Sequence, residues 1–212
     1  MKRLFIISIV LLIGSWCFGQ EIELNGSLNT SSEKRFQSAI GIGVQYQHDL
    51  GQSCKFGLGM QYISNNSKFD QIKYIDADPI TPFIEKFNST SHRLSFRFNI
   101  QGLLLNRENY SISLGPEISY NILWGKDQIE RIIVPTLKWD KFSENTGAGA
   151  LGLGLISKVE VKNFISPQYS ICFNIRPEFT TSGIIAKGYN PVFSGVIGFM
   201  EFQIGLKYRF KK

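Results

Sequence analysis

Residues 196–210 read VIGFMEFQIGLKYRF, and the alternation in this stretch decides the fold class. In an extended chain, successive side chains point to opposite faces. One face would carry the apolar and aromatic side chains of Val196, Met200, Phe202, Ile204, Leu206, Tyr208 and Phe210. The other face would carry Glu201, Gln203, Lys207 and Arg209. Lipid on one side of a strand and a polar lumen on the other produce this pattern, so we expect a transmembrane β-strand.

Further runs of the same alternation predict a closed barrel. Six are evident, and the even strand number of bacterial barrels requires one more, at residues 21–29. The six lie at residues 36–48, 54–63, 92–102, 110–122, 147–157 and 167–180. Their links are either short (49–53, 103–109, 158–166) or long (64–91, 123–146, 181–195). We predict an all-β fold, a closed eight-stranded antiparallel up-and-down transmembrane β-barrel with short periplasmic turns and long outer loops.

The polar faces of these strands predict a lumen filled by side chains. The interior of an eight-stranded barrel is only wide enough for its own side chains. Inward glycines such as Gly57 and Gly152 leave room for long charged side chains from the opposite wall. An unpaired charge away from water is costly, so these charges must pair. We predict a plugged interior crossed by a polar network of Arg97, Glu117, Asn174, Arg176, Glu178, Glu201 and Gln203.

The N-terminus predicts export from the cytoplasm. Lys2 and Arg3 precede a mostly apolar stretch at residues 4–13, and a small residue, Gly19, follows it. This is the pattern of a signal peptide cleaved after Gly19, which leaves residues 20–212 as a single barrel domain. Cleavage removes two of the 23 basic residues and none of the 17 acidic ones, which leaves a net charge of +4. Such a mildly basic balance predicts no nucleic-acid partner.

Aromatic side chains near the strand ends predict two interfacial belts. Tyr and Trp are enriched where membrane proteins cross the two membrane surfaces. One belt would lie at the periplasmic strand ends, with Tyr46, Tyr110, Tyr169 and Tyr208. The other would lie at the outer ends, with Tyr62, Tyr120 and Trp124. The alternative is that aromatic residues simply favour strands, which explains their presence but not their position at strand ends.

The last strand closes with the motif Gln203-x-Gly205-x-x-Tyr208-x-Phe210. It resembles the C-terminal assembly signal of outer-membrane β-barrels, in which the terminal aromatic is usually the final residue, whereas Lys211 and Lys212 follow here. Over essentially its whole mature length the chain resembles the small eight-stranded barrels of the OmpA, OmpX and opacity type, the outer membrane protein beta-barrel domain family. The resemblance implies a place in the Gram-negative cell outer membrane, contact with its lipid and lipopolysaccharide, recognition by the barrel-insertion machinery, and no cofactor.

Members of this class mostly have structural, adhesive or other surface-interaction roles, and we expect such a role here. The long outer loops, 64–91 and 123–146, look like hairpins that continue above the bilayer. Protruding strand edges offer unpaired backbone groups to an extracellular protein, which can bind by adding a strand. The alternative is that the apolar loop residues pack loop against loop and cover the barrel mouth. A narrow, porin-like channel and a secretion-accessory barrel are further alternatives.

The chain offers little for catalysis, disulfide formation or metal binding. Lipid A deacylases, the enzymatic alternative, resemble one another in a His/Ser pair two residues apart on the lipid-facing side near the outer rim. His92 has the right position, but Leu94 stands where that serine is expected. We therefore predict no catalytic residue. His92 is the one candidate, and we expect it to be an interfacial polar residue. Cys54 and Cys172 fall on opposite faces, so we expect no disulfide. His48 and His92 are the only histidines, so we expect no metal site.

Overall fold

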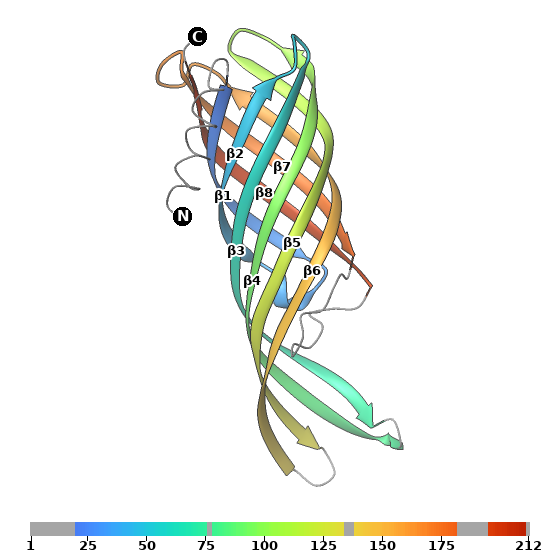
Figure 1. The fold of residues 1–212 in the computed structure, drawn as a ribbon. Helices are drawn as coiled ribbons and strands as arrows, with labels where there is room; N and C mark the ends of the chain where they lie inside the picture. Colours follow the sequence, from blue (N-terminus) through green and yellow to red (C-terminus); the bar gives the residue numbers. More distant parts are fainter. Residues whose placement is uncertain (1–19, 76–77, 134–137, 182–194, 211–212) are drawn as a thin grey trace, which may run out of the picture.

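Eight strands make up most of the chain that the structure describes (Figure 1). The computed structural model describes residues 20–75, 78–133, 138–181 and 195–210, so the predicted signal peptide at 1–19 lies outside the described residues. The strands are β1 (Gln20–Ser31), β2 (Ala39–Asp49), β3 (Cys54–Ile75), β4 (Asp78–Asn106), β5 (Tyr110–Ile133), β6 (Lys138–Val161), β7 (Tyr169–Thr181) and β8 (Val196–Arg209). A 3₁₀ turn, η1 (Lys34–Phe36), precedes β2. None of the helical residues described forms a segment long enough to cross a membrane.

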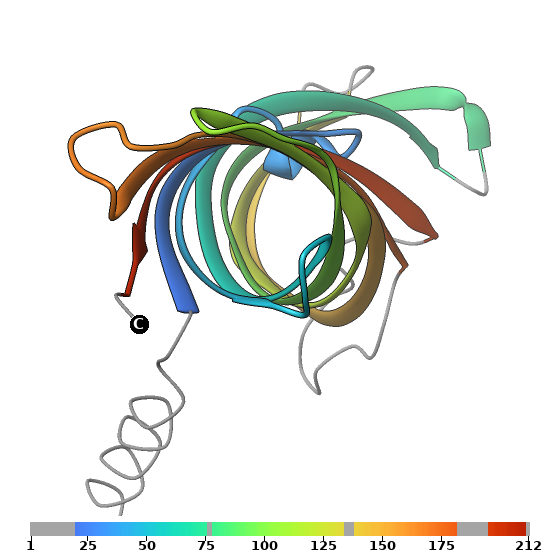
Figure 2. The ribbon, with the colours of Figure 1, turned by 90° about the horizontal axis from the view of Figure 1, so that it is seen from above.

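The strands form a closed ring in which each pairs antiparallel with its two neighbours (Figure 2). β1 pairs with β8 to close the ring, from Glu21 opposite Arg209 to Ser31 opposite Phe199. Both ends of the described chain therefore lie at the same end of the barrel (Figure 1). The predicted ring of eight strands is confirmed, including the strand at 21–29 that only the even number required.

The two ends of the barrel differ, and we name them by their connections. At the turn end, residues 50–53, 107–109 and 162–168 join neighbouring strands. At the hairpin end, β3 and β4 stay paired as far as Ile75 and Asp78. β5 and β6 likewise stay paired as far as Ile133 and Lys138. Both hairpins extend well beyond the rest of the ring, toward the bottom of Figure 1. The predicted division into a short-turn end and a long-loop end is thus confirmed for these connections, while the third predicted long loop, 181–195, lies almost wholly outside the described residues.

Most of the predicted loops 64–91 and 123–146 is strand, which confirms that they are hairpins. The sequence ended these strands too early because the contrast between their faces fades. Beyond the ring, outward positions are held by exposed polar side chains such as Lys68, Lys86 and Lys126. Alternation marks a strand that separates lipid from a polar lumen, and it disappears where water lies on both sides.

The start of β2 differs from the predicted strand at 36–48. β2 begins at Ala39, and η1 precedes it. Phe36 is only 1% exposed, and its ring lies edge-on to that of Phe199 with centroids 5.9 Å apart. If Phe36 belonged to the strand, the chain at this residue would form part of the barrel wall. The 3₁₀ turn instead places the Phe36 ring inside the end of the barrel. Burial of the ring stabilises the turn.

The exterior of the ring is apolar and its interior polar, the reverse of a water-soluble protein. On β8, Phe202 and Ile204 are 49% and 57% exposed, whereas Glu201 and Gln203 are 1% and 4% exposed. Other strands present exposed apolar residues in the same way, among them Leu24, Ile42, Leu58, Phe96, Ile118, Leu153 and Phe173. An exposed apolar surface of this extent needs lipid around it, so the fold is that of a transmembrane β-barrel, as predicted.

Replacing Ile204 by arginine should destabilise the barrel by about 2–4 kcal/mol, the usual cost of a cation on the lipid face near the middle of the bilayer. The measurement is the free energy of unfolding by urea in lipid vesicles. Ile72→Arg is the matched control, because Ile72 is 67% exposed but lies on the protruding β3 hairpin. We expect the control to change stability by less than about 0.5 kcal/mol. Equal costs at the two positions would contradict a lipid-covered exterior.

Candidate functional sites in the lumen and at the rim

Charged side chains from four strands meet in the middle of the lumen. Glu201 of β8 is ion-paired with Arg97 of β4, and Arg93 Nη2 donates a hydrogen bond to its Oε2 at 3.1 Å. Arg176 of β7 is ion-paired with Glu117 of β5. Arg97 joins the two groups, because its Nε lies 3.8 Å from Glu117 Oε1. The structure therefore brings Arg97, Glu117, Arg176 and Glu201 into one network across the bore.

The other predicted lumen residues extend this network by hydrogen bonds. Glu178 accepts bonds from Ser119 (2.8 Å) and Asn121 (2.6 Å). Gln203 Nε2 donates to Glu201 Oε1 at 2.6 Å, and Asn174 Nδ2 donates to Gln203 Oε1 at 3.0 Å. All seven residues predicted for the lumen network thus lie inside the ring and share polar partners. A cavity of about 10 Å³ lies between them and the wall of β3, room for about one water molecule.

Several lumen charges were not named from the sequence. Arg93 is fully buried, and its odd position on β4 could have marked it as inward. A second cluster lies toward the turn end, where Glu21 accepts hydrogen bonds from Lys55 and Lys207, each at 2.9 Å. This second cluster also contains the Lys158–Glu23 and Lys207–Glu160 ion pairs. Lys158 and Glu160 were missed because the strand was predicted to end at 157, whereas β6 runs to Val161 and the turn to β7 lasts until Tyr169.

An apolar cluster closes the lumen toward the hairpin end. It consists of Phe36, Leu123, Ala148, Ala150, Ile197 and Phe199, all buried. The guanidinium of Arg93 lies 4.1 Å from the centroid of the Phe199 ring, so the cluster sits directly against the charged network. Phe199 is at an inward position of β8, and the sequence analysis did not name it, because an aromatic residue is exceptional on the polar face of a barrel strand.

His92 lies on the outside of the barrel, in an aromatic group with Tyr62 and Trp124. The three rings are stacked or tilted, with centroids 6.0 Å apart for Tyr62 and His92 and 5.3 Å apart for His92 and Trp124. Tyr62 Oη and Ser64 Oγ lie 2.9 and 3.2 Å from His92 Nδ1. The structure thus supplies a serine from the neighbouring strand, although Leu94 occupies the position expected of one. Both of these contacts to His92 are from hydroxyl groups.

The remaining predicted belt residues also lie on the exterior. Those of the turn-end belt are near strand ends, whereas Tyr120, like Tyr62 and Trp124, lies within a strand that continues into a hairpin. Tyr110 and Tyr169 are the first residues of β5 and β7, at the turn end. Tyr208 contacts Tyr169 with ring centroids 5.2 Å apart, and Tyr46 contacts Phe56 at 5.9 Å. Tyr120 points outward on β5, on the same face of the strand as Trp124. The aromatic residues of the β8 motif continue this group, because Phe210 lies 5.0 Å from Tyr208.

Gly205, the small residue of the C-terminal motif, has a packing reason. A Cβ at this position would lie 2.8 Å from Glu23 Oε1 and 3.0 Å from the backbone oxygen of Leu24. The motif therefore places Gln203 in the lumen network, leaves space for Glu23 at Gly205, and puts Tyr208 and Phe210 on the exterior. Each position of the motif has a structural role in the folded barrel.

The cysteine, histidine and acidic side chains of the described residues form neither a disulfide nor a cluster of metal ligands. Cys54 and Cys172 are both free thiols, and Cys172 is buried in the lumen while Cys54 lies near the outer wall. Within residues 20–75, 78–133, 138–181 and 195–210, no three side chains of His, Cys, Asp or Glu gather as metal ligands would.

Solved structures share the architecture. A major outer membrane protein from Thermus thermophilus is similar with a TM-score of 0.50 and 12% identity, over 90% of this chain and 99% of that one. The outer membrane protease OmpT from Escherichia coli is similar with a TM-score of 0.47 and 13% identity, over 91% and 94%. The attachment invasion locus protein Ail of Yersinia pestis gives 0.45 and 12%, over 91% and 99%. At 12% identity the Thermus protein shows a shared barrel fold alone. No family model and no curated protein matches the chain.

Proposed function

We propose that this chain is a non-enzymatic outer-membrane barrel with a closed lumen, which binds a partner protein through the sheet that protrudes at its hairpin end. The apolar exterior and the polar, ion-paired interior support a place in the outer membrane. Short turns on the periplasmic side and long hairpins outside are the usual orientation of such barrels. In this setting the exterior contacts outer-membrane lipid and lipopolysaccharide, and the motif at residues 203–210 is read by the insertion machinery.

The protruding sheet, the observation that carries this proposal, consists of β3 from residue 65, β4 to 91, β5 from 125 and β6 to 151. Its two edges lack neighbours in the described part of the chain. β2 pairs with β3 only up to Ser64, and β7 pairs with β6 only from Gly152. Beyond these points the edge strands have backbone N–H and C=O groups with no strand partner among the described residues, which is the usual basis for binding by strand addition.

The inner face of the protruding sheet is already occupied. Phe69 and Phe87 stack with ring centroids 4.8 Å apart, and Phe87 is 5% exposed. Arg35, the middle residue of η1, forms an ion pair with Asp127 of β5 at 2.7 Å and so links the sheet to the β1–β2 connection. Phe69 and Phe87 therefore pack against each other on this face, whereas Ile72 of the same hairpin is exposed. The alternative that the apolar loop residues cover the barrel mouth stays a prediction. A partner would be bound by the backbone edge and not by these side chains.

The β6 edge is the more accessible of the two. On β3, Asn65 Nδ2 donates hydrogen bonds to the backbone oxygens of Arg35 and Gln37, so the β1–β2 connection covers the start of that edge. On β6, the Thr181 hydroxyl donates to the Leu151 oxygen at 3.3 Å, which shows that the backbone groups of Leu151 face away from β5. Alternation along an unbroken register gives the same direction to residues 145, 147 and 149.

A photo-crosslinking experiment on intact cells tests this proposal. Asn145 lies on the β6 edge and pairs with Lys126 of β5, in the middle of the sheet, so the two positions lie side by side. We expect a crosslinker at Asn145 to capture a protein partner and one at Lys126 to capture much less. Asn145→Pro, which removes one edge N–H, should weaken binding of the captured partner about tenfold. Equal capture from both positions, or undiminished binding by the proline variant, would contradict strand addition at this edge.

A further inference from the structure

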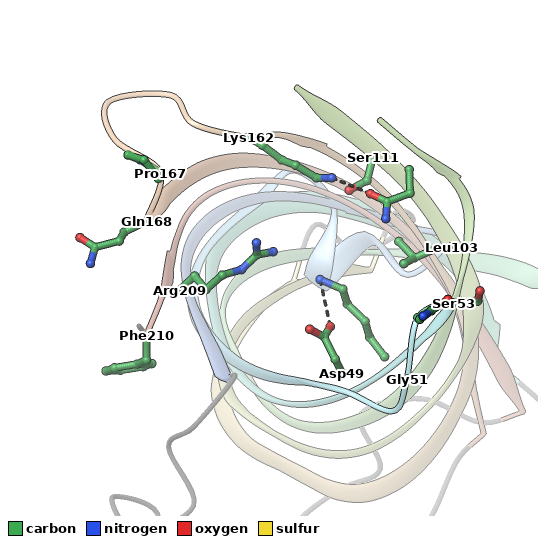
Figure 3. Close-up of a pocket in the computed structure, with 13 residues that line it drawn as sticks. Asp49, Gly51, Ser53, Leu103, Ser111, Lys162, Pro167, Gln168, Arg209 and Phe210 are labelled. Carbon is green, nitrogen blue, oxygen red and sulfur yellow. Dashed lines mark hydrogen bonds and ion pairs between the residues drawn. The ribbon is translucent and has the colours of Figure 1, made fainter. Parts of the chain in front are cut away.

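The mouth of the barrel at the turn end holds a polar pocket of about 820 Å³ (Figure 3). All three turns contribute to it, together with the end of β8. The lining residues include Asp49, Gln52, Ser53 and Lys55 from around the first turn, Leu103, Asn106 and Ser111 from around the second, Lys162, Pro167 and Gln168 from the third, and Arg209 and Phe210. Segments far apart in the sequence thus form one site, which no single run of residues revealed.

Positive charge predominates on the walls of this pocket. Lys55, Lys162 and Arg209 line it, against the single carboxylate of Asp49, whose Oδ1 lies 3.4 Å from Lys55 Nζ. Lys55 and Arg209 are both held from below by Glu21, at 2.9 Å from Lys55 Nζ to Oε2 and 2.7 Å from Arg209 Nε to Oε1. The Arg209 side chain is nevertheless 45% exposed, so its guanidinium retains donors for a ligand.

Lys162 is the cation with no ion-paired partner among the described residues. Its ammonium group donates to two neutral oxygens, Asn106 Oδ1 at 2.5 Å and the backbone oxygen of Arg107 at 2.7 Å. These bonds hold the Lys162 ammonium group at the rim of the pocket, whose lining also includes Ser111 (Figure 3). Partial burial lowers the pKa of Lys162, and the nearby positive charges of Arg209, Lys55 and Lys207 lower it further, against the opposing effect of the Glu160 carboxylate. A bound anion would relieve this repulsion between cations.

We infer that the turn-end pocket is a binding site for an acidic peptide segment, with Lys162 and Arg209 as the groups that bind its carboxylates. Two of the three cations already share Glu21, so the charge left for a ligand is small. That suits singly charged carboxylates better than a phosphate dianion. The amide and hydroxyl groups of Gln52, Ser53, Asn106, Ser111 and Gln168 both donate and accept, as peptide groups require.

The size of the pocket fits the same ligand. Its volume lies within the range of about 300–1,000 Å³ typical of small-molecule sites and is far larger than a single ion needs. Leu103, Pro167 and Phe210 add apolar surface on which an aliphatic side chain could lie. The inference depends on the pocket alone and holds whether or not the hairpin end binds a partner.

Binding of a labelled acidic peptide to the full folded chain in detergent micelles tests the inference. The probe is an acetylated tripeptide with two glutamates, and fluorescence anisotropy gives its affinity. The double variant Lys162→Gln, Arg209→Gln should bind it about tenfold more weakly. Glu21 keeps Lys55 and Lys207 as partners in this variant, so the barrel should still fold, which heat-modifiable gel migration verifies. The single variant Lys162→Gln should weaken binding in the same direction and to a smaller extent.

Two controls separate the site from general attraction to a basic protein. Lys68→Gln removes one exposed charge from the protruding β3 hairpin, away from the pocket lining, and it should leave affinity within about twofold. The same tripeptide with glutamines in place of glutamates should bind about tenfold more weakly than the acidic one. Equal weakening by Lys68→Gln, or equal binding of the neutral peptide, would overturn the inference. Displacement of the peptide by inorganic phosphate, but not by acetate at the same concentration, would overturn the preference for carboxylates.

Discussion

Replacing Glu201 by alanine is expected to lower the free energy of unfolding by about 3–5 kcal/mol, because it leaves two buried guanidinium groups without their main partner. Glu201 is ion-paired with Arg97 and with Arg93, and both arginines are 4% exposed or less. Arg97 keeps Glu117 and Glu178 only at 3.8 Å. Unfolding by urea in lipid vesicles, followed by tryptophan fluorescence, measures the change.

The cause can be separated from simple loss of packing. Adding Arg97→Met to the Glu201→Ala variant removes one of the orphaned charges, so the double variant should be more stable than the sum of the single changes predicts. Glu130→Ala is the surface control, because Glu130 pairs with the exposed Lys141 on the protruding sheet. We expect it to leave the unfolding midpoint unchanged. Strict additivity of the two lumen substitutions would argue against a shared electrostatic network.

Gly115→Ala is expected to prevent folding or to cost more than about 3 kcal/mol, since there is no space for a methyl group at this position. A Cβ on Gly115 would lie 1.8 Å from the backbone oxygen of Ile100 and 2.8 Å from the Cα of Gln101. These are main-chain atoms of β4, next to the register shift between Leu103 and Leu105, so they cannot swing aside as a side chain would. Yield of the heat-modifiable folded form and urea unfolding together measure the effect.

Gly59→Ala provides the matched control for this substitution. Gly59 also lies within a barrel strand, but the nearest atom to a Cβ there is the Val44 oxygen at 3.6 Å, an ordinary contact. We expect this variant to fold and to change stability by less than about 1 kcal/mol. Comparable losses at the two glycines would mean that β-propensity, and not the close approach of β4 and β5, determines the effect.

Alternation predicts which side of the wall a residue occupies, and for this reason the sequence could establish the two faces of each strand. It placed Phe202 outside and Glu201 inside, and the ring closure followed from the even strand number. The predicted lumen residues share that origin, since a charged face opposite an apolar one is what a strand between lipid and a polar lumen requires. These inferences need only local spacing, so they hold without knowledge of how the strands meet.

Contacts across the bore or between turns could not be inferred in the same way. Position on β4 marks Arg93 as inward, but only the registers of β4 and β8 bring it to Glu201. Phe36 reaches the interior because residues 34–36 form a turn, and burial of its ring outweighs the strand pairing that the sequence pattern predicted. Ser64 approaches His92 from a neighbouring strand, although 28 positions separate them in sequence. Each of these contacts depends on how segments far apart in sequence are aligned along the barrel axis. The alternation within one strand does not specify this alignment.

The seam between β1 and β8 has a consequence for biogenesis. β8 is synthesised last, yet it supplies Glu201 to the arginines of β4, and Lys207 and Arg209 to Glu21. Until β8 pairs, the charged side chains on the inner face of the other strands lack their partners, and they must remain hydrated. The incomplete barrel should therefore remain an open, hydrated sheet. Water should leave its interior only when β8 pairs with β1.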